Sequence, residues 1–169
     1  MIKGPSEILM DAQHIGSKAF RLAELKERGF LIPDFVTIPS NSLASLYDLE
    51  KNIDKQKLAK LTEFIYKRLP TSSYAVRSAA MTEDSNSSAQ AGQFSTKLAV
   101  NKERLNEAIE EILDDASQKL RGQTNQFSIF VQKYIEPDFA GVIFSRNPLG
   151  EYERLIEYRA GVGDLVVGG

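Results

Sequence analysis

Two cationic residues of the sequence stand where a phosphate group could be bound. The first, Lys18, lies in IGSKAF, in the first turn of a helix that apolar spacing predicts for residues 17–28. The amide groups of a first turn and the helix dipole favour an anion, and Gly16 and Ser17 would allow it a close approach. Many surface helices carry a lysine there without a ligand. Lys18 is therefore a candidate phosphate ligand, with an ordinary surface lysine as the alternative.

The second cation, Arg77, lies in YAVRSA, a segment that reads as a strand. On a strand its side chain shares a face with Ala75 and Ala79, so the guanidinium group projects over small residues. A planar guanidinium in such a place suits bidentate binding of a phosphate. An exposed arginine paired with Glu83 or Asp84 is the other interpretation, and the residues alone leave both open.

A polar run without large apolar residues extends from Thr82 to Gln93, directly after this strand. A loop of that length without its own structure tends to be functional or disordered. Gly92 within it would let the backbone approach a bound group closely, where a side chain would block it. The run therefore suits a cover over phosphates, although a surface turn would look similar.

Two further polar residues lie in segments that read as strands. Gln132, within the apolar run IFVQKYI, could hydrogen-bond an adenine edge, although a glutamine on the solvent face of a strand is the commoner case. Glu157 in LIEYRAG is either a metal-facing carboxylate or an ordinary outward residue.

Whole-chain composition excludes other kinds of chemistry. The 169 residues can bury one sizeable core. The net charge is -2 and the charged residues are spread along the chain, whereas a nucleic-acid-binding protein has a clustered basic face. The chain has no cysteine, hence no thiolate nucleophile or zinc-thiolate site. No apolar run approaches the length of a membrane-spanning helix, so we expect no membrane partner and a cytoplasmic location.

Standard catalytic motifs are missing from the sequence. It has no Gly-x-x-x-x-Gly-Lys-Ser/Thr phosphate loop, and GVGDLVVGG has the wrong glycine spacing for a dinucleotide turn. The sole histidine, His14, precedes the helix predicted for 17–28, and no Gly-x-Ser-x-Gly elbow exists, so a serine hydrolase is unsupported. His14 is more often a surface or capping residue than a catalyst in such a place.

Hydrophobic spacing predicts alternating helices and strands, and hence an α+β fold with packed helices and a largely antiparallel sheet. Helices are expected over residues 17–28, 42–52, 55–68 and 101–120. Strands are expected at 35–38, near a sheet edge because of two flanking prolines, and in YAVRSA and FSTKLAV. FSIFVQKYI, AGVIFSR and RLIEYRAG are expected to follow one another as a three-stranded meander.

Three segments carry a resemblance to a known family. In chain order they are IGSKAFRLAELKERGFLIPDFVTIPS, AVRSAAMTEDSNSSAQAGQFSTKLAVN and VQKYIEPDFAGVIFSRNPLGEYERLIEYRAGVGDLVVGG. Together they resemble the N-terminal ATP-binding domain shared by phosphoenolpyruvate synthase, pyruvate phosphate dikinase and rifampin phosphotransferase. The resemblance covers most of the chain outside residues 41–71.

This resemblance implies an ATP-grasp type fold that clamps Mg-ATP, and a reaction in which ATP phosphorylates a histidine on a separate domain or chain, en route to pyruvate or a similar acceptor. Lys18 and Arg77 match the family's phosphate-contacting lysine and arginine, and are the implied catalytic residues. Gly92 and Thr96 match the loop that covers the phosphates. Gln132 matches a glutamine close to the nucleotide.

The sequence also departs from the family pattern. Ala79 stands where a second serine is usual, and Gln90 where an aromatic residue is common. The Gln-Asp-x-Glu segment that supplies carboxylates for Mg²⁺, and the carrier histidine, have no counterpart in the 169 residues. We therefore expect residues 1–169 to form the N-terminal portion of this ATP-binding domain, a partial ATP-grasp domain with weak or no turnover by itself. The alternative is a non-catalytic module of the same fold that binds a partner protein.

Overall fold

The computed structural model describes residues 2–9, 12–48, 50, 52–80, 95–119, 126–146, 150 and 154–163. The chain divides into two compact units, Met1–Tyr134 and Ile135–Gly169. Unit 1 contains α1 (Pro5–Ile8), η1 (Ala12–His14), α2 (Ser17–Glu27), β1 (Phe35–Ile38), α3 (Ser40–Leu43), η2 (Ala44–Leu46), α4 (Lys55–Arg68), β2 (Tyr74–Ala80), β3 (Thr96–Val100), α5 (Leu105–Lys119) and β4 (Phe127–Lys133). Unit 2 contains β5 (Phe139–Phe144) and β6 (Leu155–Ala160).

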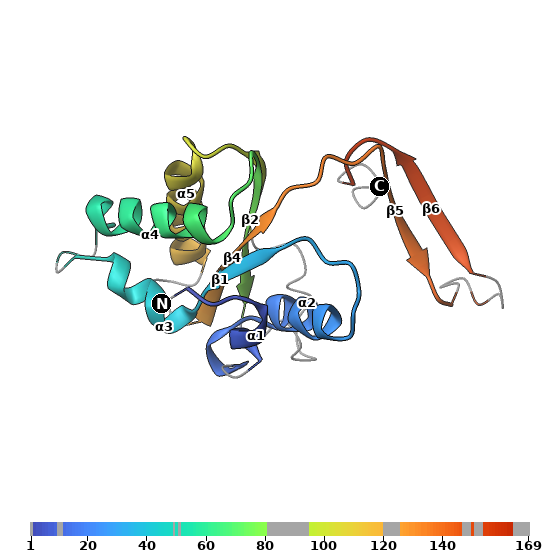
Figure 1. The fold of residues 1–169 in the computed structure, drawn as a ribbon, viewed down its shortest axis with the longest axis horizontal. Helices are drawn as coiled ribbons and strands as arrows, with labels where there is room; N and C mark the ends of the chain where they lie inside the picture. Colours follow the sequence, from blue (N-terminus) through green and yellow to red (C-terminus); the bar gives the residue numbers. More distant parts are fainter. Residues whose placement is uncertain are drawn as a thin grey trace. The chain divides into compact units, whose positions relative to one another are not determined.

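Unit 1 is built on a four-stranded antiparallel sheet in the order β1-β4-β2-β3. Helices cover both faces of this sheet (Figure 1). On one face α4 and α5 pack over the larger apolar core, which includes Val76, Ile109 and Val131. On the other face α1 and α2 pack over a smaller cluster, in which Ala19 of α2 meets Phe130 and other residues of the sheet. The mixed α+β architecture with an antiparallel sheet is the predicted one.

Several element predictions are confirmed closely. The helix predicted for 17–28 is α2, and Gly29 follows it with φ +85, the left-handed conformation that commonly ends a helix. Strand β1 lies at a sheet edge, as its prolines indicated. Helix α4 has the predicted bounds, and α5 buries the predicted stripe, which includes Leu105, Ile109 and Ile112.

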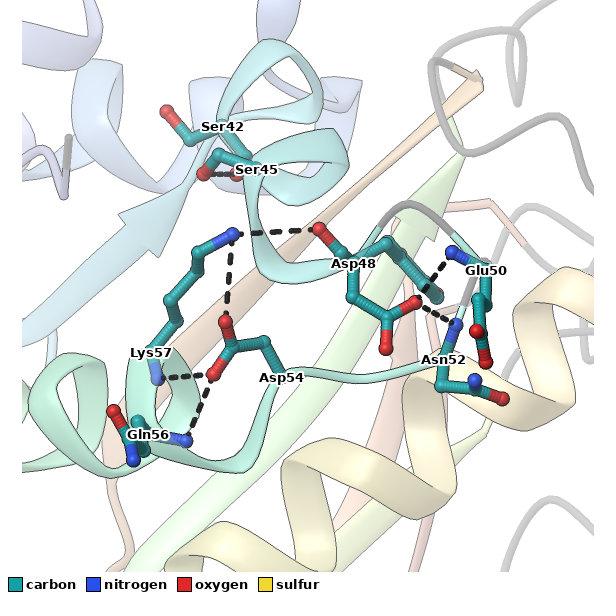
Figure 2. A network of polar contacts seen from close by, with 9 residues as sticks. Ser42, Ser45, Asp48, Glu50, Asn52, Asp54, Gln56 and Lys57 are labelled. Carbon is teal, nitrogen blue, oxygen red and sulfur yellow. Dashed lines mark hydrogen bonds and ion pairs between the residues drawn. The ribbon is translucent and has the colours of Figure 1, made fainter.

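The helix predicted for residues 42–52 is wrong. The described residues of this range form α3 and η2, and Tyr47 then bridges Ile53. The carboxylate of Asp48 accepts hydrogen bonds from the backbone amides of Glu50 and Asn52, at 2.9 and 2.8 Å (Figure 2). An aspartate that binds nearby amides in this way offers the backbone an alternative to the helix, because those amides no longer need helical partners.

The predicted three-stranded meander is also wrong. Strand β4 lies in the middle of the four-stranded sheet, between β1 and β2, while β5 and β6 pair with each other in a separate two-stranded sheet. Six of the seven β4 residues are buried, so the strand has an apolar environment on both faces. The run FSIFV, apolar on both strand faces apart from one serine, is typical of such a central strand. None of the described helices is long and apolar enough to cross a membrane.

Candidate phosphate-binding site

The strand register places three of the predicted site residues on one face of the sheet. Arg77 in β2 pairs with Thr96 of β3 on one side and with Phe130 of β4 on the other. Side chains of directly opposed residues in an antiparallel pair point to the same face. Gln132 follows Phe130 by two positions and therefore shares that face as well. Arg77, Thr96 and Gln132 thus come from three adjacent strands and occupy one surface.

The first turn of α2 lies against this same face. The backbone amide of Gly16, the N-cap residue, donates to the buried hydroxyl oxygen of Ser128 at 3.0 Å. A Cβ atom built on Gly16 would lie 2.6 Å from the Cβ of Ala79, so the two residues are in close contact. Ala79 follows Arg77 by two positions in β2, a separation of about 7 Å along a strand. The start of α2, with exposed Lys18, therefore lies close to the Arg77 position.

The role that sequence analysis gave Gly16 is corrected by this contact. We expected the glycine to let an anion approach the helix, whereas its missing side chain makes room for the backbone and side chain of Ala79. The sequence pattern does not indicate Ser128 as a functional residue. Ser128 is a single small polar residue near the start of an otherwise apolar strand. That pattern by itself does not indicate a hydrogen-bond partner 112 residues away.

The guanidinium group of Arg77 is partly buried and lies over an aromatic ring. Its central carbon is 5.9 Å from the ring centroid of Phe130, a distance at which a cation is attracted to the ring face. The Nε atom is buried, and within the described part of the chain it has no hydrogen-bond partner. A buried donor on a charged group is costly to leave unpaired, and an anion is the kind of group that satisfies it best.

Gln132 lies in a buried position, so the alternative of a solvent-facing glutamine is wrong. The residue is 9% exposed and stands opposite Ala75 and Phe35 in the neighbouring strands. The amide nitrogen donates to the backbone carbonyl of Pro33 at 3.2 Å. Gln132 therefore ties the segment before β1 to the central strand, and a contact with adenine stays a prediction.

Thr96 is exposed and is held in place by the residue before it. The hydroxyl of Ser95 donates to the carboxylate of Asp115 in α5, and the backbone carbonyl of Ser95 accepts from the amide of Ser78 at 3.3 Å. Burial acts to raise the pKa of Asp115, but hydrogen bonds from Lys119 and Ser95, together with the charges of Lys119 and Lys97, outweigh it and hold that pKa below its usual value. An ionised Asp115 therefore fixes the start of β3 beside Arg77, a contact that the sequence did not indicate.

The remaining candidates are not brought to this surface by any described contact. Gly92, the polar run from 82 to 93, and the possible Arg77 partners Glu83 and Asp84 lie outside the described residues. Glu157 is exposed in β6 of unit 2, opposite Val142. His14 ends η1 and is half-buried.

Among the residues that the structure describes, no three acidic or histidine side chains gather closely enough to hold a metal ion. The described donor set thus contains no carboxylate cluster for a metal ion. It fits an anion better, because it brings together a helix start, an arginine with a buried unpaired Nε atom, and an exposed threonine. Such a group of donors can bind a phosphate and neutralise its charge.

Comparison with known proteins points to a nucleotide-binding domain. The pyruvate phosphate dikinase AMP/ATP-binding domain family matches residues 47–169. The chain is also similar to an uncharacterised phosphotransferase, YvkC of Bacillus subtilis (strain 168), with 29% identity over an alignment of 189 positions that includes 94% of the chain. The chain spans only 22% of the length of this relative. Since the family match extends over well more than half of the sequence, the chain belongs to the pyruvate phosphate dikinase AMP/ATP-binding domain family.

Proposed function

We propose that the chain is the ATP-binding portion of a phosphotransferase, in which ATP phosphorylates a carrier histidine on another domain or chain. The observation that carries the proposal is the environment of Arg77. Its buried Nε atom has no hydrogen-bond partner in the described part of the chain, and its side chain lies on the sheet face against which α2 starts. Family membership and a relative named as a phosphotransferase support it. An ATP-grasp fold is part of the same proposal.

In this proposal the chain's own groups position the triphosphate and neutralise its charge. Arg77 binds phosphate oxygens through its guanidinium group, and Lys18 adds a positive charge at the dipole end of α2. Thr96 and Gly92 contribute to covering the phosphates, and Gln132 lies near the nucleotide. Phosphoryl transfer asks little covalent chemistry of the protein, so positioning and charge neutralisation account for most of what such a site does. Mg²⁺ enters the proposal only as the ion that accompanies ATP.

Calorimetric titration with Mg-ATP tests the proposal. We expect Arg77→Ala to weaken binding by roughly 10- to 100-fold, since hydrogen bonds to charged groups are worth about 1.5–3 kcal/mol. Lys18→Ala should weaken binding by a smaller factor, because Lys18 is exposed and its charge is better screened.

Lys67→Ala is the matched control for the loss of one lysine. Lys67 is exposed in α4, on the opposite face of the sheet, where it pairs with Glu63. Its removal should leave the affinity for Mg-ATP unchanged. Equal affinity in the original chain, Arg77→Ala and Lys67→Ala would refute the proposal.

A protein-binding module is the second candidate, and one observation favours it. On the β5–β6 ribbon Phe139, Ile143, Ile156 and Tyr158 are each more than half exposed. Exposed apolar patches often mark protein interaction sites. This candidate predicts a chain without affinity for Mg-ATP, so the same titration distinguishes the two.

A further inference from the structure

The start of α2 is fixed to the sheet by a buried contact between residues far apart in the sequence. Gly16, at the N-cap, is buried, and its amide donates to the hydroxyl oxygen of Ser128 in the central strand β4. Ser128 is itself completely buried. The hydrogen bond therefore lies away from solvent, where neither partner could exchange it for a bond to water without opening the structure.

Gly16 also packs against the backbone of β2 at Ala79. A Cβ atom on Gly16 would lie 2.6 Å from the Cβ of Ala79, 2.8 Å from its carbonyl oxygen and 2.9 Å from its carbonyl carbon. Real Cβ atoms do not approach backbone atoms so closely, and the β2 backbone is held by ladders to both β3 and β4. Any other residue at position 16 would therefore push the first turn of α2 away from the sheet.

Both contacts act on the part of the helix that carries Lys18. Ala79 and Ser128 pair directly across β2 and β4, and Arg77 pairs with Phe130 one pleat further along the same two strands. The distance between the start of α2 and Arg77 is consequently set by where Gly16 rests on the Ala79–Ser128 pair. A shift of the helix start by one ångström would change the spacing of the cations without disturbing Arg77 itself.

We propose that Gly16 and Ser128 are positioning residues for phosphate binding: they hold the first turn of α2 at the spacing from Arg77 that a polyphosphate requires. This inference rests on the proposed function. Neither residue need touch the ligand. Their effect on binding passes through the placement of Lys18 and the positive end of α2.

Ser128→Ala is the informative variant, because it removes the acceptor and keeps the backbone and most of the volume. We expect its affinity for Mg-ATP to fall about five- to tenfold, the effect of one buried neutral hydrogen bond. The affinity for inorganic tripolyphosphate should fall by the same factor, because the inferred defect lies at the phosphates. Gly16→Ala should lower the affinity for both ligands further. If Gly16→Ala does not fold, Ser128→Ala still tests the inference.

Thr62→Val is the matched control on the other face of the sheet. The hydroxyl of Thr62 is also mostly buried and hydrogen-bonded, to the carbonyl of Ala59 and to Asn106 of α5. Its removal should lower the melting temperature while the folded protein binds Mg-ATP as the original chain does. A purely structural role for Ser128 would give the same pattern as Thr62→Val and would overturn the inference.

A double-mutant cycle between Ser128→Ala and Lys18→Ala identifies the route of the effect. If Ser128 acts through the start of α2, the affinity lost in the double variant is smaller than the product of the two single losses. The reason is that a misplaced Lys18 already contributes less to binding, so that its removal costs less affinity. Fully multiplicative losses would contradict the inference while leaving the ATP site itself intact.

Amide hydrogen exchange without nucleotide separates this inference from the proposed function. The peptide that begins α2 should exchange faster in Ser128→Ala than in the original chain and in Thr62→Val. Unchanged exchange overturns the contact as a determinant of the helix position, whatever the chain binds. An original chain without affinity for Mg-ATP and tripolyphosphate refutes the proposed function, and the positioning role with it.

Discussion

Arg77 carries a stability cost that the proposed phosphate binding would offset. Its guanidinium is partly buried over Phe130, and its Nε atom has no hydrogen-bond partner among the described residues. A charged group that is held away from water without full pairing destabilises the folded state. Such a cost is commonly retained where a ligand later supplies the missing partner.

Replacing Arg77 by methionine should therefore separate stability from binding. Methionine keeps much of the stem packing over Phe130 but removes the charge and the unpaired donor. We expect the free energy of unfolding to stay equal or to rise by up to about 1 kcal/mol, while the affinity for Mg-ATP falls as it does in Arg77→Ala. Urea denaturation measures the first quantity and calorimetry the second. A loss of stability above about 2 kcal/mol would show that Arg77 has a structural partner.

Helix α2 is held to the sheet at both ends, by different physical means. Its first turn is held by the buried contact of Gly16 with Ser128. Near its last turn, Lys26 pairs with Asp34, which precedes β1, and Asp34 also pairs with Lys133 at the end of β4. Hydrogen bonds from Lys26 and then from Lys133 lower the pKa of Asp34. The helix thus has one uncharged and one ionic attachment.

The ionic attachment gives a stability term that depends on pH. Because the pKa of Asp34 is lowered in the folded state, its contribution is fully present above the unfolded-state value of 3.8 and is lost as the pH falls through the folded-state value. Asp34→Asn should cost at most about 1 kcal/mol at pH 7, since the carboxylate is about half exposed and screened.

Urea denaturation of the original chain and Asp34→Asn between pH 7 and pH 3 measures this dependence. The difference in stability between the two chains should shrink only at the acid end. A difference that stays constant down to pH 3 would mean that the carboxylate of Asp34 contributes no charge-dependent stability.

Sequence reasoning succeeded at the element scale where periodicity decides structure. The apolar spacing of α2, α4 and α5 gave their positions, and Arg77 was correctly placed on a strand face with Ala75 and Ala79. It failed where local polar contacts compete with helix formation, as at Asp48, and where pairing joins distant strands, as with β4. The contact of Gly16 with Ser128 depends on both strand order and register, so no local pattern could have indicated it.

Among the residues that the structure describes, the two units differ sharply in how much apolar surface they bury. Unit 1 has two apolar clusters, one on each face of its sheet. Unit 2 is described as a two-stranded ribbon whose one face carries Phe139 and Ile143 opposite Ala160 and Ile156. Phe139 and Ile143 are 65% and 68% exposed. Two strands with one uncovered apolar face bury too little surface to be stable alone.

Local stability should accordingly be distributed unevenly along the chain. We expect backbone amides of β5 and β6 to exchange with solvent far faster than those of β4, because opening the ribbon exposes little additional apolar surface whereas β4 opens only with the whole sheet. Exchange measured by mass spectrometry on peptides covering 127–133 and 139–144 tests this in one sample.

As a check, Ile143→Ser should leave the melting temperature of the main cooperative transition unchanged, since the side chain that the substitution shortens is already largely exposed. Equal protection of the two peptides, or a clearly lowered transition in Ile143→Ser, would mean that the ribbon folds and unfolds as part of one cooperative structure with the four-stranded sheet.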